Sequence, residues 1–110
     1  MTLIEKREDM KVVGIGTKAR NVLRSIKRTS PDVVIMDFVL PDANGSQLIQ
    51  DITNQWKNIR VIVLSLYNNP DFQEAAKRNG AFTYLVKGGS MEDFFSSIYA
   101  AYEDGRKSKF

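Results

Sequence analysis

Three apolar runs in the sequence each lead into a polar side chain that could take part in chemistry. One run is followed by the carboxylate of Asp37, a second by the hydroxyl of Ser65, and a third by the ammonium group of Lys87. In open α/β sheets, functional groups gather outside the carboxyl ends of the strands. The pattern therefore predicts that these three groups meet at one edge of a parallel sheet.

The three groups together suit chemistry at phosphorus. A carboxylate beside a fixed ammonium group stays ionised, so Asp37 would serve as a nucleophile toward phosphorus. The ammonium of Lys87 and the hydroxyl of Ser65 would hold the oxygens of an acyl phosphate. Each residue alone has a simpler interpretation, as a structural carboxylate or helix cap, a hydrogen-bonded hydroxyl, or a solvated lysine. Their shared position at strand ends favours a site.

Apolar runs alternate along the chain with segments in which apolar residues recur at helical spacing. This alternation predicts an α/β fold with a parallel sheet. We expect strands at residues 11–15, 32–37, 60–66 and 82–86. We expect one helix between the cap residue Thr17 and the break at Ser30-Pro31, and others that open at Gly45-Ser46, cover residues 72–78 and run from 91 to about 103.

The composition is that of a single globular domain of 110 residues. The chain has no cysteine, which excludes disulfides and thiolate metal sites and suits a reducing compartment. It has no histidine, so catalysis would have to use carboxylates, hydroxyls or lysine. No apolar run approaches the roughly 18 residues that span a bilayer, and the N-terminal residues lack the apolar core of a secretion signal. We expect a cytoplasmic protein without membrane contact.

The net charge is +3, and part of the excess lies on one helical face that carries Arg20, Arg24, Lys27 and Arg28. A solvated outer face is the simpler interpretation, and an anion-binding surface is the alternative. Nucleic-acid binding by this domain alone is not expected.

The motifs follow one another in a specific order and spacing. An apolar strand ending in Asp37 is followed by the loop 38–45, with its proline and glycine. A second strand ends in Ser65, and a last strand carries Tyr84 three places before Lys87. These motifs, which extend over nearly the whole chain, resemble the receiver domain of two-component response regulators.

The resemblance implies a flavodoxin-like parallel sheet with helices on both faces, and a signalling module rather than an enzyme. Asp37 would accept a phosphoryl group from a sensor histidine kinase. Ser65, Tyr84 and Lys87 would stabilise that group or respond to it. The resemblance also implies Mg²⁺, which Asp37 and the backbone carbonyl of Val39 would help to hold.

The chain departs from this family in its N-terminal part. The family's first strand ends in an acidic pair that holds Mg²⁺, and this strand, its acidic pair and most of the first helix are missing here. Residues 1–10 resemble a remnant of that helix, and we expect residues 104–110 to form a basic tail. Without the acidic pair, we expect phosphorylation of Asp37 to be impaired and the surface around Tyr84 to stay in one state.

The missing strand lies centrally in the family's sheet, so the four expected strands would leave exposed edges. We expect either a rearranged sheet, with residues 11–15 beside the strand that ends in Asp37, or a homodimer. The dimer would form through the exposed sheet edge or the last helix. An alternative function is therefore a degenerate receiver that acts as an interaction or dimerisation module without phosphorylation.

The segment Gly14–Ala19 allows a third interpretation. It fits the pattern G-x-G-x-x-A between an expected strand and an expected helix, with Asp37 about 20 residues later, as in dinucleotide-binding folds. The chain is short for such a domain. A nucleotide-binding fragment remains the third alternative.

Overall fold

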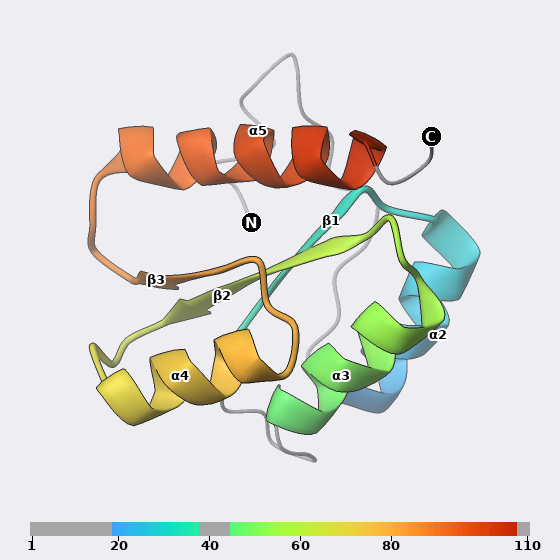
Figure 1. The fold of residues 1–110 in the computed structure, drawn as a ribbon, viewed down its shortest axis with the longest axis horizontal. Helices are drawn as coiled ribbons and strands as arrows, with labels where there is room; N and C mark the ends of the chain where they lie inside the picture. Colours follow the sequence, from blue (N-terminus) through green and yellow to red (C-terminus); the bar gives the residue numbers. More distant parts are fainter. Residues whose placement is uncertain (1–18, 38–44, 108–110) are drawn as a thin grey trace.

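The computed structural model describes residues 19–37 and 45–107, with residues 19 and 20 described by their backbone only. Within these ranges, helices and strands alternate along the chain (Figure 1). The elements are, in order, α2 (Ala19–Thr29), β1 (Val33–Met36), α3 (Gly45–Gln55), β2 (Arg60–Ser65), α4 (Pro70–Arg78), β3 (Thr83–Val86) and α5 (Met91–Lys107).

The strands of the described ranges form a parallel sheet in the order β1-β2-β3. Their valine and isoleucine side chains suit strands that are covered on both faces. In the register, Val33 lies beside Arg60, and Ser65 lies beside Val86. The carboxyl ends of the three strands therefore lie at one edge of the sheet, and the predicted parallel α/β fold is confirmed.

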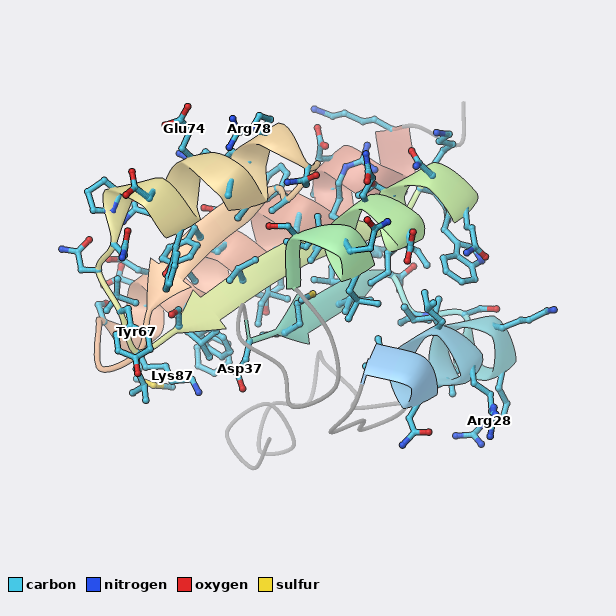
Figure 2. The ribbon with its side chains drawn as sticks, turned by 90° about the horizontal axis from the view of Figure 1, so that it is seen from below. Arg28, Asp37, Tyr67, Glu74, Arg78 and Lys87 are labelled. Atoms are coloured by element: carbon cyan, nitrogen blue, oxygen red, sulfur yellow. The ribbon has the colours of Figure 1, made fainter. Side chains whose placement is uncertain are left out.

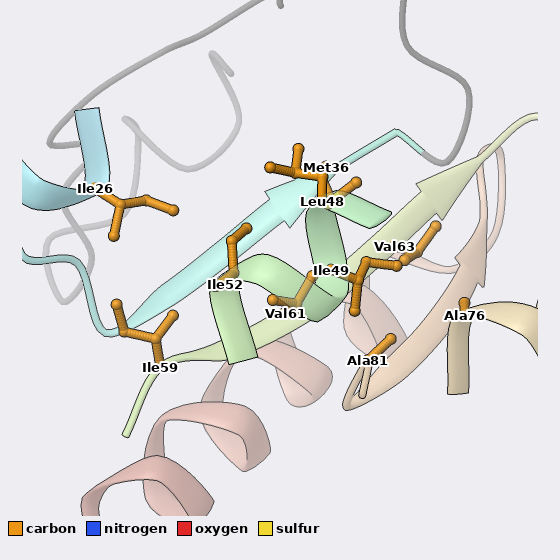
Figure 3. Packing of buried hydrophobic residues seen from close by; sticks show 10 residues of the cluster. All are labelled: Ile26, Met36, Leu48, Ile49, Ile52, Ile59, Val61, Val63, Ala76 and Ala81. Atoms are coloured by element: carbon orange, nitrogen blue, oxygen red, sulfur yellow. The ribbon is translucent and has the colours of Figure 1, made fainter. Parts of the chain in front are cut away.

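Helices cover both faces of the sheet, because successive side chains of a strand point to opposite faces. Val61 and Val63 of β2 belong to a core cluster with α2, α3 and α4, whereas Ile62 packs with α5 on the other face. The buried residues of the larger cluster, drawn in Figure 3, are Ile26, Met36, Leu48, Ile49, Ile52, Ile59, Val61, Val63, Ala76 and Ala81. The sheet is thus fixed from both sides, which holds its carboxyl edge in place.

Helix α4 begins two residues before the start expected from the sequence. The side chain of Asn69 caps it, because Oδ1 accepts hydrogen bonds from the N–H of Asp71 at 2.9 Å and of Phe72 at 3.3 Å. Pro70 occupies the first helical position, where its lack of an N–H costs nothing. Cap chemistry, rather than the apolar spacing, sets the start of this helix.

Helix α5 is longer than the sequence predicts. It continues to Lys107, so the expected end near Glu103 and the expected basic tail are wrong for residues 104–107. The last three residues of the chain lie outside the described ranges. Contacts with a distant turn account for the additional length.

The last turn of α5 packs against the turn between α3 and β2 through two consecutive residues, Asp104 and Gly105. Arg60 donates from Nε to Oδ2 of Asp104 at 2.6 Å and from Nη1 to the carbonyl of Lys57 at 2.7 Å. Gly105 is buried, and a β-carbon at this position would overlap the carbonyl oxygen of Asn58. The helix can approach this closely because Gly105 has no side chain.

Several predictions fall outside the described residues. These are the strand at 11–15, the helix remnant at 1–10 and most of the nucleotide motif. The fourth strand, the rearranged sheet and the homodimer therefore stay predictions. Among the helices that the structure describes, none is both long and apolar enough to cross a membrane.

Candidate functional site

Asp37 and Lys87 form an ion pair at the carboxyl edge of the sheet (Figure 2). Asp37 follows β1 and Lys87 follows β3, and Lys87 Nζ lies 2.8 Å from Asp37 Oδ1. Because β2 lies between β1 and β3, the pair spans the end of β2. The side chain of Asp37 is 52% exposed and that of Lys87 is 37% exposed. A molecule in solvent can therefore reach both charges.

Ser65 is the last residue of β2, the strand that this ion pair spans. It is buried, with 5% of its surface exposed. Its carbonyl accepts a hydrogen bond from the N–H of Lys87 at 2.6 Å, which ties the backbone of Lys87 to β2. Its Oγ accepts a hydrogen bond from the N–H of Tyr67 at 3.1 Å. The hydroxyl keeps its own hydrogen to donate to another group.

Tyr84 is connected with Ser65 through the backbone of Tyr67. In the register of the sheet, Tyr84 lies beside Val63, two residues before Ser65. Its hydroxyl donates to the carbonyl of Tyr67 at 2.7 Å. The N–H of the same residue bonds to Ser65 Oγ. The two residues expected to act as a switch are thus joined by hydrogen bonds to one residue between them.

Tyr67 is a residue of this region that the sequence pattern did not single out. Its backbone is bound on both sides, and its ring lies edge-on to that of Phe72 with the centroids 6.2 Å apart. Nevertheless Tyr67 is 57% exposed, and the preceding Leu66 is 70% exposed. The available signal was a pair of large apolar residues directly after a strand-end serine, where a polar loop is usual.

The sheet edge, the ion pair and the order of the motifs agree with the comparison of the chain with known families. The model of the response regulator receiver domain family matches residues 1–99. The chain belongs to this family. Receiver domains are signalling modules of two-component systems, and their general function is to accept a phosphoryl group. The predicted resemblance is therefore confirmed.

Curated relatives of this receiver domain are named as transcriptional regulators. The uncharacterized transcriptional regulatory protein YvfU of Bacillus subtilis is 31% identical over 97 residues, which cover 88% of this chain and 48% of YvfU. YxjL of the same species is 28% identical over 99 residues, which cover 90% of this chain and 45% of YxjL. The receiver domain spans about half the length of the curated relatives it matches.

Solved structures share the receiver fold. A DNA-binding response regulator of the LuxR family from Staphylococcus aureus has a TM-score of 0.82 and 25% identity, and the match covers 92% of this chain and 84% of that chain. A two-component response regulator of the LuxR family from Aurantimonas sp. has a TM-score of 0.86 and 26% identity, over 94% of this chain and 74% of that chain. These values support the flavodoxin-like fold class.

Receiver domains generally bind Mg²⁺. In the part of this receiver domain that the structure describes, no group of three acidic, histidine or cysteine side chains could hold a metal ion. Asp37 is present, but it lies against an ammonium group. The carbonyl of Val39, the other expected ligand, lies outside the described residues. Because Mg²⁺ prefers octahedral coordination by oxygen, the described residues by themselves do not form a magnesium site.

Proposed function

We propose that this receiver domain accepts a phosphoryl group on Asp37 from the phosphohistidine of a sensor histidine kinase. The ion pair between Asp37 and Lys87 carries the proposal, because it sets a positive charge beside an exposed carboxylate at the carboxyl edge of the sheet. A carboxylate oxygen is a nucleophile toward phosphorus, and the ammonium group beside it attracts the oxygens of an incoming phosphoryl group. Histidine kinases are the partners with which receiver domains interact.

In the proposed transfer, a carboxylate oxygen of Asp37 forms a bond to phosphorus while the bond from phosphorus to the histidine nitrogen breaks. The electron pair of the broken bond stays on that nitrogen. The ammonium of Lys87 and the hydroxyl hydrogen of Ser65 stabilise the charge on the phosphoryl oxygens. The N–H of Tyr67 holds the Ser65 oxygen in place, so that the hydroxyl is oriented before the phosphoryl group arrives.

Intact mass spectrometry with a small phosphodonor, phosphoramidate with Mg²⁺, tests this proposal. We expect the wild-type chain to gain the mass of one phosphoryl group and Asp37→Asn to gain none. Asp71→Asn is the matched control, because it removes another exposed carboxylate, in the first turn of α4. It should be phosphorylated like the wild type. A wild-type chain that gains no mass, or an Asp37→Asn variant that does, would contradict the proposal.

A phosphorylation-independent interaction module is the second candidate, and an exposed apolar side of α5 favours it. Met91, Tyr99 and Tyr102 are 44%, 40% and 38% exposed. Their spacing places them on one side of the helix, next to the side on which Ile98 and Ala101 face the sheet. Groups of exposed apolar side chains mark protein contacts. We propose that this face forms a homodimer, because some receiver domains dimerise.

Sedimentation equilibrium tests the dimer. We expect the wild type to self-associate and the double variant Tyr99→Lys/Tyr102→Lys to sediment as a monomer, because two charges would be buried in the contact. Ser96→Lys/Ala100→Lys adds the same charges at other exposed positions of α5 and should leave the dimer intact. A monomeric wild type, or equal dissociation of both variants, would refute a contact through Tyr99 and Tyr102.

A further inference from the structure

We propose that the basic face of α2, made of Arg24, Lys27 and Arg28, docks an acidic helical segment of a partner protein. All three side chains are exposed. Figure 2 shows Arg28 extending into solvent from the periphery of the domain, apart from the labelled Asp37 and Lys87. The inference concerns a second surface and does not rest on phosphoryl acceptance by Asp37.

The positive charge of the chain is concentrated in α2. This helix of 11 residues contains four cations and no acid, whereas the net charge of all 110 residues is +3. The other residues together therefore carry a net charge of −1. In α4 and α5, cations occur together with acids, such as Glu74 with Arg78 and Glu103 with Arg106. The basic face is thus a local feature and not a consequence of a basic chain.

The arrangement within α2 brings like charges together. Arg24 precedes Lys27 by three residues and Arg28 by four, and side chains at these spacings are neighbours on a helix. No ion pair joins the three cations to an acid within residues 19–37 and 45–107. The helix dipole stabilises Lys27 and Arg28 in the last turn, but it does not account for Arg24. An acidic partner would relieve the repulsion.

The extent of the basic face fits carboxylates on one turn of a helix. Arg24 and Arg28 are about 6 Å apart along the helix axis. Carboxylates at positions i and i+4 of a partner helix are separated by the same distance, so each can lie opposite one of the two arginines. Tight binding of nucleic acid commonly neutralises about 6–10 phosphates, which exceeds what this face offers.

Fluorescence anisotropy with a labelled helical peptide tests the inference. The peptide carries glutamates at positions i, i+3 and i+4, and a second peptide has glutamines there. We expect the 110-residue chain to bind the glutamate peptide at low ionic strength and to release it at high ionic strength. R24Q/K27Q/R28Q should weaken binding about tenfold. The control K77Q/R78Q/R106Q removes three exposed cations from the last turns of α4 and α5 and should change it less than about twofold.

Equal losses for the two triple variants would overturn the inference, because net charge alone would then explain binding. Binding of the glutamine peptide as tightly as the glutamate peptide would also overturn it. Preference for a DNA duplex, with a loss confined to the α2 variant, would overturn the assignment to an acidic protein segment. Thermal melting shows whether each variant is folded, and R24Q alone, which should also weaken binding, replaces the triple variant if that one unfolds.

Discussion

Replacing Lys87 by glutamine is expected to slow phosphoryl uptake by Asp37 about 100-fold, because an oriented donor at a site of developing charge contributes about this much to a rate. The ammonium group of Lys87 lies 2.8 Å from the Asp37 carboxylate. The backbone N–H of Lys87 donates a hydrogen bond to the carbonyl of Ser65, which positions the residue. Both side chains of the ion pair are accessible to solvent, so its loss should lower the free energy of unfolding by less than about 1 kcal/mol. The variant therefore separates chemistry from folding.

The rate is measured as the time course of the phosphorylated mass with phosphoramidate, and the stability by urea denaturation. Lys77→Gln removes an exposed lysine from α4 and is expected to behave like the wild type in both measurements. A Lys87→Gln variant that is phosphorylated at the wild-type rate would refute the role of the ammonium group. A variant that is slow only because it has unfolded would be recognised by its urea curve.

Replacing Gly105 by alanine is expected to lower the free energy of unfolding by about 2 kcal/mol, because the new methyl group overpacks a filled space. The same change in an ordinary helix stabilises it by about 1 kcal/mol. The difference in sign arises because a β-carbon at Gly105 meets the backbone carbonyl of Asn58, which cannot move aside like a flexible side chain. Either α5 shifts from the turn between α3 and β2, or its last turn unwinds.

Urea denaturation of Gly105→Ala, followed by circular dichroism, measures this effect. Ser96→Ala is the matched control, because Ser96 is exposed in the middle of the same helix and its change should alter the stability by less than about 0.5 kcal/mol. A stabilised Gly105→Ala variant would show that α5 does not lie against the carbonyl of Asn58.

The sequence by itself determined which side chains reach the carboxyl edge of the sheet. Runs of branched apolar residues separated by helical segments form parallel strands, because each helical crossover returns the chain to the end of the sheet at which the preceding strand began. Asp37, Ser65 and Lys87 follow or end such runs, so their common edge was predictable. In the structure, an ion pair joins Lys87 to Asp37 and a backbone hydrogen bond joins Lys87 to Ser65. Local chemistry also determined the start of α4, where Asn69 and Pro70 form a cap.

The link between Ser65 and Tyr84 was decided by the tertiary structure. Strand pairing fixes Tyr84 beside Val63, and the loop after β2 must then bend so that the carbonyl of Tyr67 meets the hydroxyl of Tyr84. Neither spacing nor propensity specifies the path of such a loop, because the hydrogen bond between Tyr84 and Tyr67 connects residues that are 17 positions apart. The two ends of this connection, Ser65 and Tyr84, were therefore predictable from the sequence, whereas its centre at Tyr67 was not.

The end of α5 was decided by tertiary contacts as well. By local rules, a glycine near the end of a helix followed by basic residues indicates a stop. Here Asp104 binds Arg60, which is 44 residues away, and Gly105 allows the helix to lie against the carbonyl of Asn58. Packing against a distant turn outweighs the weak helix propensity of one glycine. The sequence determined the apolar face of this helix, and only the folded turn beside it decided its length.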